Sequence, residues 1–538
     1  MTARSRVPRA VPVVVAGGGP VGLSLAVELG LRGVECLVVE PRRKPTRSRP
    51  RAKTLNTRTM EHFRRWGLAD RLRATAPLPT SWSQDVSFGT TLLGPEITRF
   101  TGVLGLSDDG FSPELGQQLP QYVLEDLLRA VVRELPACTL LLGSRVVAVD
   151  GDAVRINDAH GDVVDVRADY VVGADGARST VREAIGARYE GNQALRPNTG
   201  VVFRSTELLH RLPHRPAVQT WLLNERTPGL MGPIDRTGTW WLIAFGVNGT
   251  SPDLDAVGLV QGALGEDLPV EIVSTDPWTA RMELVDRARA DRVFLIGDAA
   301  HLNPPFGGHG LNTGIGDAVD LGWKLAACLD GWGGPELLAS HEAERRPLQQ
   351  LVIAEATANM ATLATELLTA DLDAPGQRGA LARARAAEHI VRAKTAEYFS
   401  LDLVLGHRYE ASPILPPGAE PTGQWAVRAG RGRRLPHFWC GPGLALHDRL
   451  GSGYTVVASP AADIQPIVAA AWARRMPTTI TRVTPDQSAA LGAEIVVVRP
   501  DQVVAWCGSE PPADADVLID TLTGHHAATL ADTSARER

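Results

Sequence analysis

The segment VVVAGGGPVG at residues 13–22 decides the fold of this chain. Its apolar half is typical of a buried strand. Its glycines match the pattern G-x-G-x-x-G, and a helix-like stretch follows up to Arg32. Gly33 stands where a helix-ending glycine is expected, and ECLVVE at 35–40 predicts a second strand. Strand, glycine turn, helix and strand in this order predict a β-α-β unit of the Rossmann type.

The glycines of this turn have separate tasks in a dinucleotide-binding site. Gly17 permits the tight turn, Gly19 lets the backbone approach a pyrophosphate, and Gly22 lets the helix pack on the strand. Glu40 ends the second strand, 21 residues beyond Gly19, where a carboxylate can accept hydrogen bonds from ribose hydroxyls. The alternative is a glycine-rich turn in an unrelated α/β fold, and the turn alone does not separate FAD from NAD. The residues expected to hold the dinucleotide are Gly17, Gly19, Pro20, Val21, Gly22 and Glu40.

Composition and charge exclude several classes of protein. The chain has 538 residues, enough for about three to four domains. Its 55 basic and 61 acidic residues give a net charge of −6, which argues against a general nucleic-acid binder. No apolar run approaches the ~18 residues of a membrane span, and we interpret the basic start with its apolar run as a strand, not a signal peptide. We therefore expect neither a nucleic-acid partner nor a membrane partner.

The cysteines indicate the redox environment. They lie far apart in the sequence and form neither a C-x-x-C pair nor metal-ligand spacing. They predict no metal site, no disulfide framework and a reducing, cytoplasmic location. The five residues are Cys36, Cys138, Cys328, Cys440 and Cys507.

Two further segments follow strand-like apolar runs. The first is GADGARS at 173–179. The second is LIGDAAH at 295–301, which continues as LNPPFGGHGLN at 302–312 into a long helical region. The segment 412–424 is dense in proline and glycine, as is typical of a linker, and the residues after it alternate strand-like and helix-like runs.

In this order and spacing, the three motif segments resemble the single-component FAD-dependent aromatic hydroxylases of the para-hydroxybenzoate hydroxylase fold. The resemblance covers essentially the whole chain. It is strongest to the phenol, phenylpropionate and polyketide hydroxylases, which have a C-terminal thioredoxin-like domain. It implies an α/β fold in which a β-sheet substrate domain is inserted into a Rossmann-like FAD-binding domain of the GR2 type. The expected FAD-binding domain comprises 1–75, 117–187 and 285–400, the substrate domain 76–116 and 188–284, the linker 412–424, and the thioredoxin-like domain 425–538.

The resemblance also assigns cofactor residues to the two later segments. Asp175 and Gly176 match a motif near the flavin pyrophosphate that influences nicotinamide binding, and Asp298 matches a buried aspartate that binds the ribityl chain. The glycine loop before residue 312 would open a helix toward the flavin pyrimidine edge. Taken singly, these residues could form an Asp-Gly turn and a glycine loop that caps an ordinary helix, with Asn312 as its N-cap. The full set from the resemblance is Arg51, Gln121, Asp175, Gly176, Asp298, Pro305, Gly308, Gly310, Leu311 and Asn312.

The activity implied by the resemblance is monooxygenation. NADPH or NADH reduces FAD, O₂ forms a flavin C4a-hydroperoxide, and an electron-rich aromatic carbon takes its distal oxygen. The expected partners are O₂, NAD(P)H and a small-molecule aromatic substrate, either phenol-like or polycyclic or heteroaromatic, and the protein is expected to be a monomer or a homodimer. The C-terminal domain lacks a C-x-x-C pair, which excludes dithiol chemistry and favours a packing or oligomerisation role.

The substrate pocket is expected between the β-rich middle region and the loop before the long helical region. For each aromatic residue there, the alternative is ordinary sheet core. Spacing identifies no catalytic base: His62 and His301 are weak candidates, and Tyr122 is the tyrosine nearest to a cofactor motif. The expected pocket residues are Trp221, Met231, Pro233, Trp241, Pro304 and Phe306.

Two other functions stay open. The same fold could support Baeyer–Villiger oxygenation or quinol oxidation in natural-product biosynthesis, or the chain could be a flavin-binding regulatory or partner protein. The retained Asp175 and Asp298 argue against the last of these.

Overall fold

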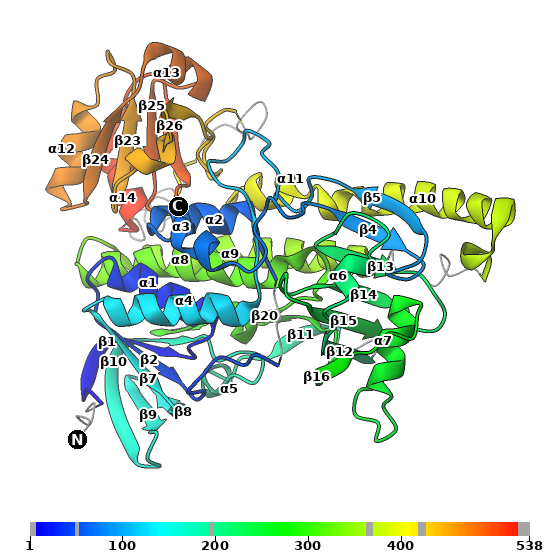
Figure 1. The fold of residues 1–538 in the computed structure, drawn as a ribbon. Coiled ribbons are helices and arrows are strands. Elements are labelled where there is room, and N and C mark those ends of the chain that lie inside the picture. The colour runs from blue at the N-terminus through cyan, green and yellow to red at the C-terminus, as the bar shows by residue number, and fades with distance from the viewer. Residues whose placement is uncertain (1–6, 49–52, 193–196, 362–369, 418–426, 526–538) are drawn as a thin grey trace, which may run out of the picture.

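The computed structural model describes residues 7–48, 53–192, 197–361, 370–417 and 427–525. Its elements form two large sheets, a helical layer and a small separate α/β unit, shown in Figure 1. In the described part of the chain, no helix is long and apolar enough to cross a membrane.

The first sheet brings the three motif segments to one edge. Its main strand order is β18-β19-β10-β1-β2-β7, and β1 pairs in parallel with both β2 and β10. β10 pairs in parallel with β19. The carboxyl ends of parallel strands meet at the same edge of a sheet, where ligands of open α/β folds bind. The strands are β1 (Ala10–Ala16), β2 (Cys36–Glu40), β7 (Cys138–Leu142), β10 (Val163–Gly173), β18 (Arg289–Ala290) and β19 (Val293–Leu295).

Helices cover one face of this sheet, and an antiparallel extension of the sheet covers the other (Figure 1). The predicted first helix forms as α1, and Gly33 has a φ of +75°, as expected for a helix-ending glycine. The helices on the sheet are α1 (Pro20–Gly30), α4 (Gln121–Glu134) and α8 (His309–Leu329), with α2 (Thr57–Arg65) and α3 (Ala69–Thr75) beside them. β8 (Arg145–Asp150) and β9 (Ala153–Asn157) form the extension, and α5 (Thr180–Ala184) follows β10.

The second sheet has seven strands in the order β16-β12-β15-β14-β13-β4-β5. Alternate residues of β15 face opposite sides: Trp240 packs in the core beneath α7, and Trp241 packs in the core beneath α10. The elements are β4 (Val86–Gly89), β5 (Glu96–Phe100), β12 (Pro197–Arg204), α6 (Leu208–Arg211), β13 (Gln219–Leu222), β14 (Gly229–Pro233), β15 (Thr239–Phe245), α7 (Ala256–Leu264) and β16 (Glu271–Thr279).

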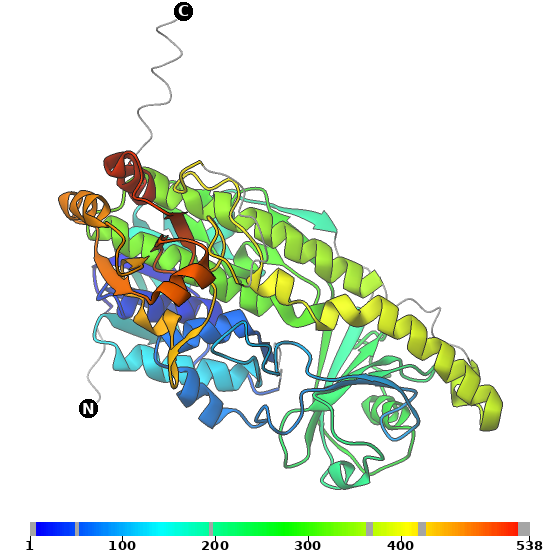
Figure 2. The same cartoon turned by 90° about the horizontal axis from the view of Figure 1, so that it is seen from above.

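Small sheets and long helices connect the two large sheets. Figure 2 shows α10 running along the second sheet and extending beyond it. The long helices are α9 (Pro335–Ala361) and α10 (Gly376–Tyr398), and the short α11 (Leu401–Leu405) follows them. One small sheet contains β11 (Tyr189–Asn192), β17 (Met282–Val285) and β20 (His301–Leu302), and another pairs β3 (Thr54–Leu55) with β6 (Gln117–Gln118).

The C-terminal unit has the strand and helix order of a thioredoxin-like fold. Its sheet order is β24-β23-β25-β26, with β23 parallel to β24 and antiparallel to β25. The elements are β21 (Trp439–Gly441), β22 (Leu444–Ala445), β23 (Tyr454–Ala458), α12 (Gln465–Ala473), β24 (Thr478–Arg482), α13 (Pro485–Leu491), β25 (Ile495–Val498), β26 (Val504–Gly508) and α14 (Ala515–Thr523). This arrangement agrees with the predicted fold class.

A buried ion network joins this unit to the helical layer. Arg499, just after β25, is fully buried and donates hydrogen bonds to Glu344 of α9 at 2.6 and 3.0 Å and to Asp320 of α8 at 3.1 Å. Asp501 also accepts from Arg499, and Lys324 lies 2.7 Å from Glu344. Cations lower the pKa of Asp320 far below its usual range, against the opposing effect of burial. The C-terminal unit therefore holds α8 and α9 through charges that water does not screen.

The structure adds one contact to the prediction about cysteines. The Sγ atoms of Cys36 and Cys138 lie 3.6 Å apart on the paired strands β2 and β7, and both thiols are free.

We expect Arg499→Met to lower the free energy of unfolding by about 3–5 kcal/mol, because it leaves the buried carboxylates of Asp320, Glu344 and Asp501 with Lys324 as the one lysine or arginine that remains in the network among the described residues. Urea denaturation followed by circular dichroism measures the change. The control is Arg71→Ala, which breaks an exposed ion pair with Glu134 and should cost less than about 1 kcal/mol. Equal losses in the two variants would contradict a stabilising role for the network.

Candidate active site

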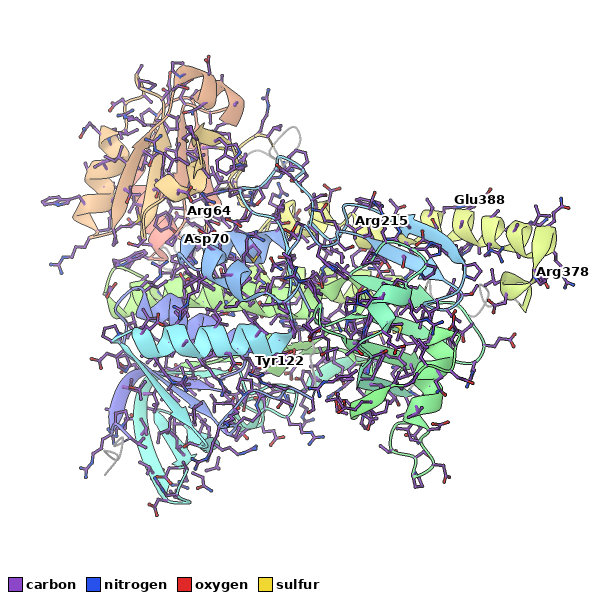
Figure 3. The ribbon with its side chains drawn as sticks, in the orientation of Figure 1. Arg64, Asp70, Tyr122, Arg215, Arg378 and Glu388 are labelled. Carbon is purple, nitrogen blue, oxygen red and sulfur yellow. The ribbon has the colours of Figure 1, made fainter. Side chains whose placement is uncertain are left out.

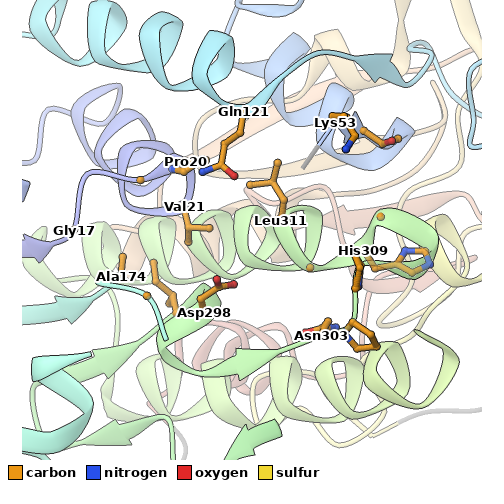
Figure 4. A pocket seen from close by; sticks show the side chains of 18 of the residues that line it. Gly17, Pro20, Val21, Lys53, Gln121, Ala174, Asp298, Asn303, His309 and Leu311 are labelled. Atoms are coloured by element: carbon orange, nitrogen blue, oxygen red, sulfur yellow. The ribbon is translucent and has the colours of Figure 1, made fainter. Parts of the chain in front are cut away.

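A cavity of about 540 Å³ lies at the carboxyl edge of the first sheet and continues to the second sheet. Figure 4 shows Gly17 and Ala174 at one end and Lys53, His309 and Asn303 at the other. Most of the predicted cofactor residues line this one cavity. They are Gly17, Gly19, Pro20, Val21, Glu40, Gln121, Asp175, Gly176, Asp298, Pro305, Gly308, Gly310 and Leu311. Arg51, which the resemblance also assigns to the cofactor, lies outside the described residues.

Two glycines of the first motif leave room for other backbone atoms of the protein, whereas the third faces open space in the cavity. A Cβ on Gly17, whose φ is +104°, would lie 2.3 Å from the carbonyl oxygen of Ala174. A Cβ on Gly22 would lie 2.0 Å from the carbonyl oxygen of Gly17. A Cβ on Gly19, in contrast, would meet no atom within 4 Å, and Gly19 has an ordinary extended backbone with φ −77°. Protein packing therefore demands the first two glycines, whereas Gly19 keeps the cavity open, as the backbone cradle of a phosphate requires.

Glu40 is held in place at the end of β2. Its Oε2 accepts a hydrogen bond from the backbone N–H of Gly18 at 2.8 Å, and its Oε1 accepts from the backbone N–H and the side chain of Arg42. The residue is only 3% exposed and lines the cavity. This position suits acceptance of further hydrogen bonds from ribose hydroxyls through the remaining lone pairs.

Asp175 has one carboxylate oxygen that the described protein does not satisfy. Its Oδ2 accepts from the backbone N–H groups of Thr180 at 2.8 Å and Val181 at 3.3 Å. Its Oδ1 is buried and has no hydrogen-bond partner among the described residues, and burial raises the pKa of Asp175. A buried acceptor without a partner is costly, so a donor from a bound molecule fits this position.

Asp298 differs from the prediction of a buried carboxylate. β19 ends at Leu295, and the turn Gly297–Ala299 carries Asp298 beyond the sheet edge, where its side chain is exposed and lines the cavity (Figure 4). Its backbone carbonyl accepts a hydrogen bond from the hydroxyl of Tyr189. The side chain of Asp298 therefore faces the place where a ligand would bind.

The glycine loop directs the N-terminus of α8 into the cavity. Gly307 and Gly308 have φ angles of +79° and +69°, which favour glycine, and Gly308 is the residue before the helix. His309 begins α8 and lines the cavity, and burial lowers its pKa to about 4. Neutral imidazole and the backbone N–H groups of the first helical turn therefore meet the ligand at this end, with the positive end of the helix dipole.

Asn312 does not line the cavity, contrary to the prediction, and it is not the N-cap. Its Oδ1 accepts from the backbone N–H of Asn56 at 2.9 Å and from the hydroxyl of Thr59 at 2.8 Å. Its Nδ2 donates to the carbonyls of Thr54 and Gly308. Because both ends of the amide are engaged by protein, Asn312 positions the glycine loop against the segment before α2.

Aromatic rings line the cavity where it reaches the second sheet. Trp221 stacks on Phe306 at a centroid distance of 6.0 Å and contacts Phe245 at 5.8 Å. Trp241 faces the same space, with the ammonium of Lys53 at 3.5 Å from the centroid of its ring. Of the predicted pocket residues, Trp221, Trp241, Pro304 and Phe306 line the cavity.

The prediction for Met231 was wrong, and Pro233 is not among the lining residues. Met231 is fully buried in the core beneath α7, while its neighbour Leu230 lines the cavity. Successive residues of a strand point to opposite faces, so residues 231 and 233 of β14 face away from the cavity. The same alternation places Ile243 and Phe245 in the lining with Trp241, and sequence alternation could have found them.

None of the histidines or the tyrosine considered as a base lines the cavity. His301 is buried, with Nε2 at 2.8 Å from Asp317 of α8, and this carboxylate raises its pKa against the effect of burial. His62 is buried in α2, and burial lowers its pKa. Tyr122 contacts Arg47 on the outer side of α4.

Sequence patterns did not identify the ionisable side chains that line the aromatic end of the cavity, where it reaches the second sheet. They include Lys53 and the consecutive residues Glu397 and Tyr398 at the end of α10. Glu397 lies 2.7 Å from Lys394, and α10 contacts the turn Phe306–Gly308. Burial raises the pKa of Glu397. No sequence motif marks Glu397, because folding brings α10 to the glycine loop from 90 residues further along the chain.

Comparison with known proteins agrees with this geometry. A family model described as FAD binding domain matches residues 10–356, and one described as aromatic-ring hydroxylase, C-terminal, matches residues 429–526. The putative polyketide hydroxylase of Streptomyces halstedii is 32% identical, covering 94% of this chain and 94% of its own. The 4-methyl-5-nitrocatechol 5-monooxygenase of a Burkholderia species is 32% identical, covering 95% of this chain and 97% of its own.

A solved structure extends the likeness to the whole fold. The rebeccamycin biosynthetic enzyme RebC with reduced flavin is 34% identical and has a TM-score of 0.89, covering 96% of this chain and 100% of that chain. The predicted fold class, the FAD cofactor and the assignment to the flavin monooxygenases are confirmed. Its motifs, its cavity and these relatives together show that this chain belongs to the family of FAD-dependent aromatic-ring hydroxylases.

Proposed function

We propose that this enzyme uses NADPH or NADH and O₂ to hydroxylate a small, electron-rich aromatic molecule. The proposal rests on one observation: the cofactor motif residues, such as Gly19, and the aromatic side chains, such as Trp221, line the same cavity. The names of the relatives, which include a polyketide hydroxylase and a nitrocatechol monooxygenase, support an aromatic substrate. Monomer or homodimer remains the expected assembly, and the free cysteines support a reducing, cytoplasmic location.

The cofactor end of the cavity suits FAD. When bound, FAD accepts a hydride from the nicotinamide and activates O₂. Gly19 and the start of α1 would hold its pyrophosphate, Glu40 its adenosine ribose, and Asp298 its ribityl chain. The start of α8 would stabilise negative charge on the reduced ring through its N–H groups.

The aromatic end suits a planar substrate kept away from water. Trp221, Phe245 and Phe306 provide ring faces, and apolar walls restrict water at the site of oxygen transfer. Glu397 is a carboxylate in this wall, and its helix α10 contacts the glycine turn Phe306–Gly308. We assign to it acceptance of the proton of a substrate hydroxyl, because a raised pKa brings a carboxylate closer to the working pH of a general base.

We expect Gly19→Ala to weaken FAD binding by at least about tenfold while the apoprotein keeps its melting temperature. The added methyl meets no protein atom and would occupy the space assigned to the pyrophosphate. Titration of apoprotein with FAD, followed by flavin fluorescence, measures the affinity. Gly441→Ala is the matched control, since its Cβ also meets nothing within 4 Å but lies in the C-terminal unit. Unchanged affinity in Gly19→Ala would contradict the assigned phosphate cradle.

We expect some aromatic compounds, and not their aliphatic counterparts, to accelerate NAD(P)H oxidation by the FAD-loaded enzyme. Under ¹⁸O₂, the product should contain one ¹⁸O on an intact ring, as shown by mass spectrometry and NMR. Ring expansion would instead establish Baeyer–Villiger chemistry, and loss of two hydrogens without oxygen would establish quinol oxidation. If no phenol, phenolic acid or polycyclic aromatic stimulated turnover, the proposed activity would be wrong and a binding role would be favoured.

We expect Glu397→Gln to lower kcat by about 10²-fold with a smaller change in KM, because the amide cannot take up the proton. Steady-state kinetics across pH should also lose the limb that reports the base. Glu388→Gln is the control on the same helix, where Glu388 projects to solvent (Figure 3). If flavin content and melting temperature were normal and kcat were unchanged in Glu397→Gln, another group would have to accept the proton.

A further inference from the structure

The four lysines of the chain differ in how their charge is balanced. Lys324 lies 2.7 Å from Glu344, and Lys394 lies 2.7 Å from Glu397. Lys44 is exposed to solvent, which screens its charge. Lys53 has neither an ion-pair partner nor full exposure to solvent, since no carboxylate of the described residues lies within ion-pair distance of its ammonium. Its ammonium lies instead over the ring of Trp241, 3.5 Å from the centroid.

The charge of Lys53 bears on ligand binding because of where the residue lies. Lys53 is only partly exposed, and it lines the cavity together with Trp241. Figure 4 shows it at the end of the pocket near His309, opposite the end that contains Gly17. This is the end at which Trp221 and Phe306 supply stacked rings. A cation therefore stands in the wall of the space assigned to the aromatic substrate.

A lysine in such a place is stabilised by an anion in the cavity. Burial lowers the pKa of Lys53 to about 7, because protein replaces the water that would solvate the ammonium. The face of an indole attracts a cation, but more weakly than a carboxylate does. His309, the neighbouring imidazole, is neutral and supplies no counter-charge.

We propose that Lys53 determines substrate specificity by pairing with an acidic oxygen of the substrate, so that the cavity selects aromatic molecules with a phenolate or a carboxylate. This inference rests on the proposed function, since it assigns the substrate class of the same cavity. Lys53 is a specificity residue that binds the substrate anion, and it takes no part in proton transfer. The Trp241 ring lies 3.5 Å from the ammonium, measured to its centroid, and this contact fixes the ammonium in position.

The test compares ligands that share a ring and differ in charge. The first pair is 2,4-dinitrophenol and 2,4-dinitroanisole, and the second pair is 2-naphthoate and 2-naphthamide. Both pairs are measured below pH 7, where the phenol and the carboxylic acid are ionised and Lys53 keeps its proton. Dissociation constants are measured on the FAD-loaded enzyme from the perturbation of the flavin absorbance. The variants are Lys53→Met, which keeps an unbranched side chain of similar length, and Lys53→Arg, which keeps the charge. Lys44→Met is the control for removal of a lysine elsewhere.

We expect the wild-type enzyme to bind at least one anion about tenfold or more tightly than its neutral partner, the size of one charge-assisted hydrogen bond. Lys53→Met should lose this preference while it binds the neutral partners as before, and Lys53→Arg and Lys44→Met should retain it. Equal affinities within both pairs in the wild-type enzyme, or no measurable binding of either anion, would overturn the proposal. So would a preference that survives in Lys53→Met.

One more outcome distinguishes a role of Lys53 toward the substrate from a role toward the flavin, and another separates the specificity from the proposed function. If Lys53→Met left the anion preference intact but changed the flavin reduction potential, the charge would serve the cofactor and the proposal would be wrong. The binding measurements need no turnover. An enzyme that prefers anions through Lys53 but inserts no oxygen would contradict the proposed function and leave the assigned specificity standing.

Discussion

The close approach of two turns is the contact on which the rest of the site depends. Gly17 and Ala174 follow β1 and β10, and they lie so near that a single Cβ on Gly17 would meet the Ala174 carbonyl at 2.3 Å. This contact keeps the first glycine turn against the turn that contains Asp175. The parallel pairing of β10 with β19 adds Asp298 to the same edge. Three segments separated by more than a hundred residues thereby form one end of a cavity, and backbone packing sets their spacing before any ligand binds.

Buried charges fix the position of α8, the helix that begins at that cavity. Asp317 of α8 pairs with His301 and with Arg345 of α9, and Asp320 one turn further along pairs with Lys324 and Arg499. A buried ion network costs much desolvation, so its value lies in fixing one arrangement of the helices that contribute to it. Because α8 begins at the cavity, this network determines where its N-terminus points. The thioredoxin-like unit, whose sequence has no C-x-x-C pair, contributes through Arg499 to the position of a helix at the active site.

The two ends of the cavity are lined by different kinds of groups: backbone atoms at one end and side chains at the other. Backbone groups and glycines form the cofactor end, where Gly19 leaves space and Asp175 leaves one oxygen without a partner in the described protein. Side chains form the other end, where Trp221 and Lys53 set shape and charge. Backbone geometry suits a cofactor that every family member shares. Side chains on a sheet can vary without changing the fold, which suits an end that selects the substrate.

The sequence by itself determined the features that rest on local sterics. Gly22 must be glycine because its Cβ would meet the carbonyl of Gly17, five residues earlier, so the glycine turn, the β-α-β unit and Glu40 could be predicted from the residues. The two aspartate motifs were predicted from the family resemblance. Only the tertiary structure decided the features that need distant partners. It showed that Asn312 binds protein, that Met231 faces away from the cavity, and that Cys36 lies beside Cys138. It also brought Glu397 to the glycine loop and Lys53 to Trp241. The physical reason is that strand register and helix packing choose the face on which a side chain lies, and a long-range contact leaves no local pattern in the chain.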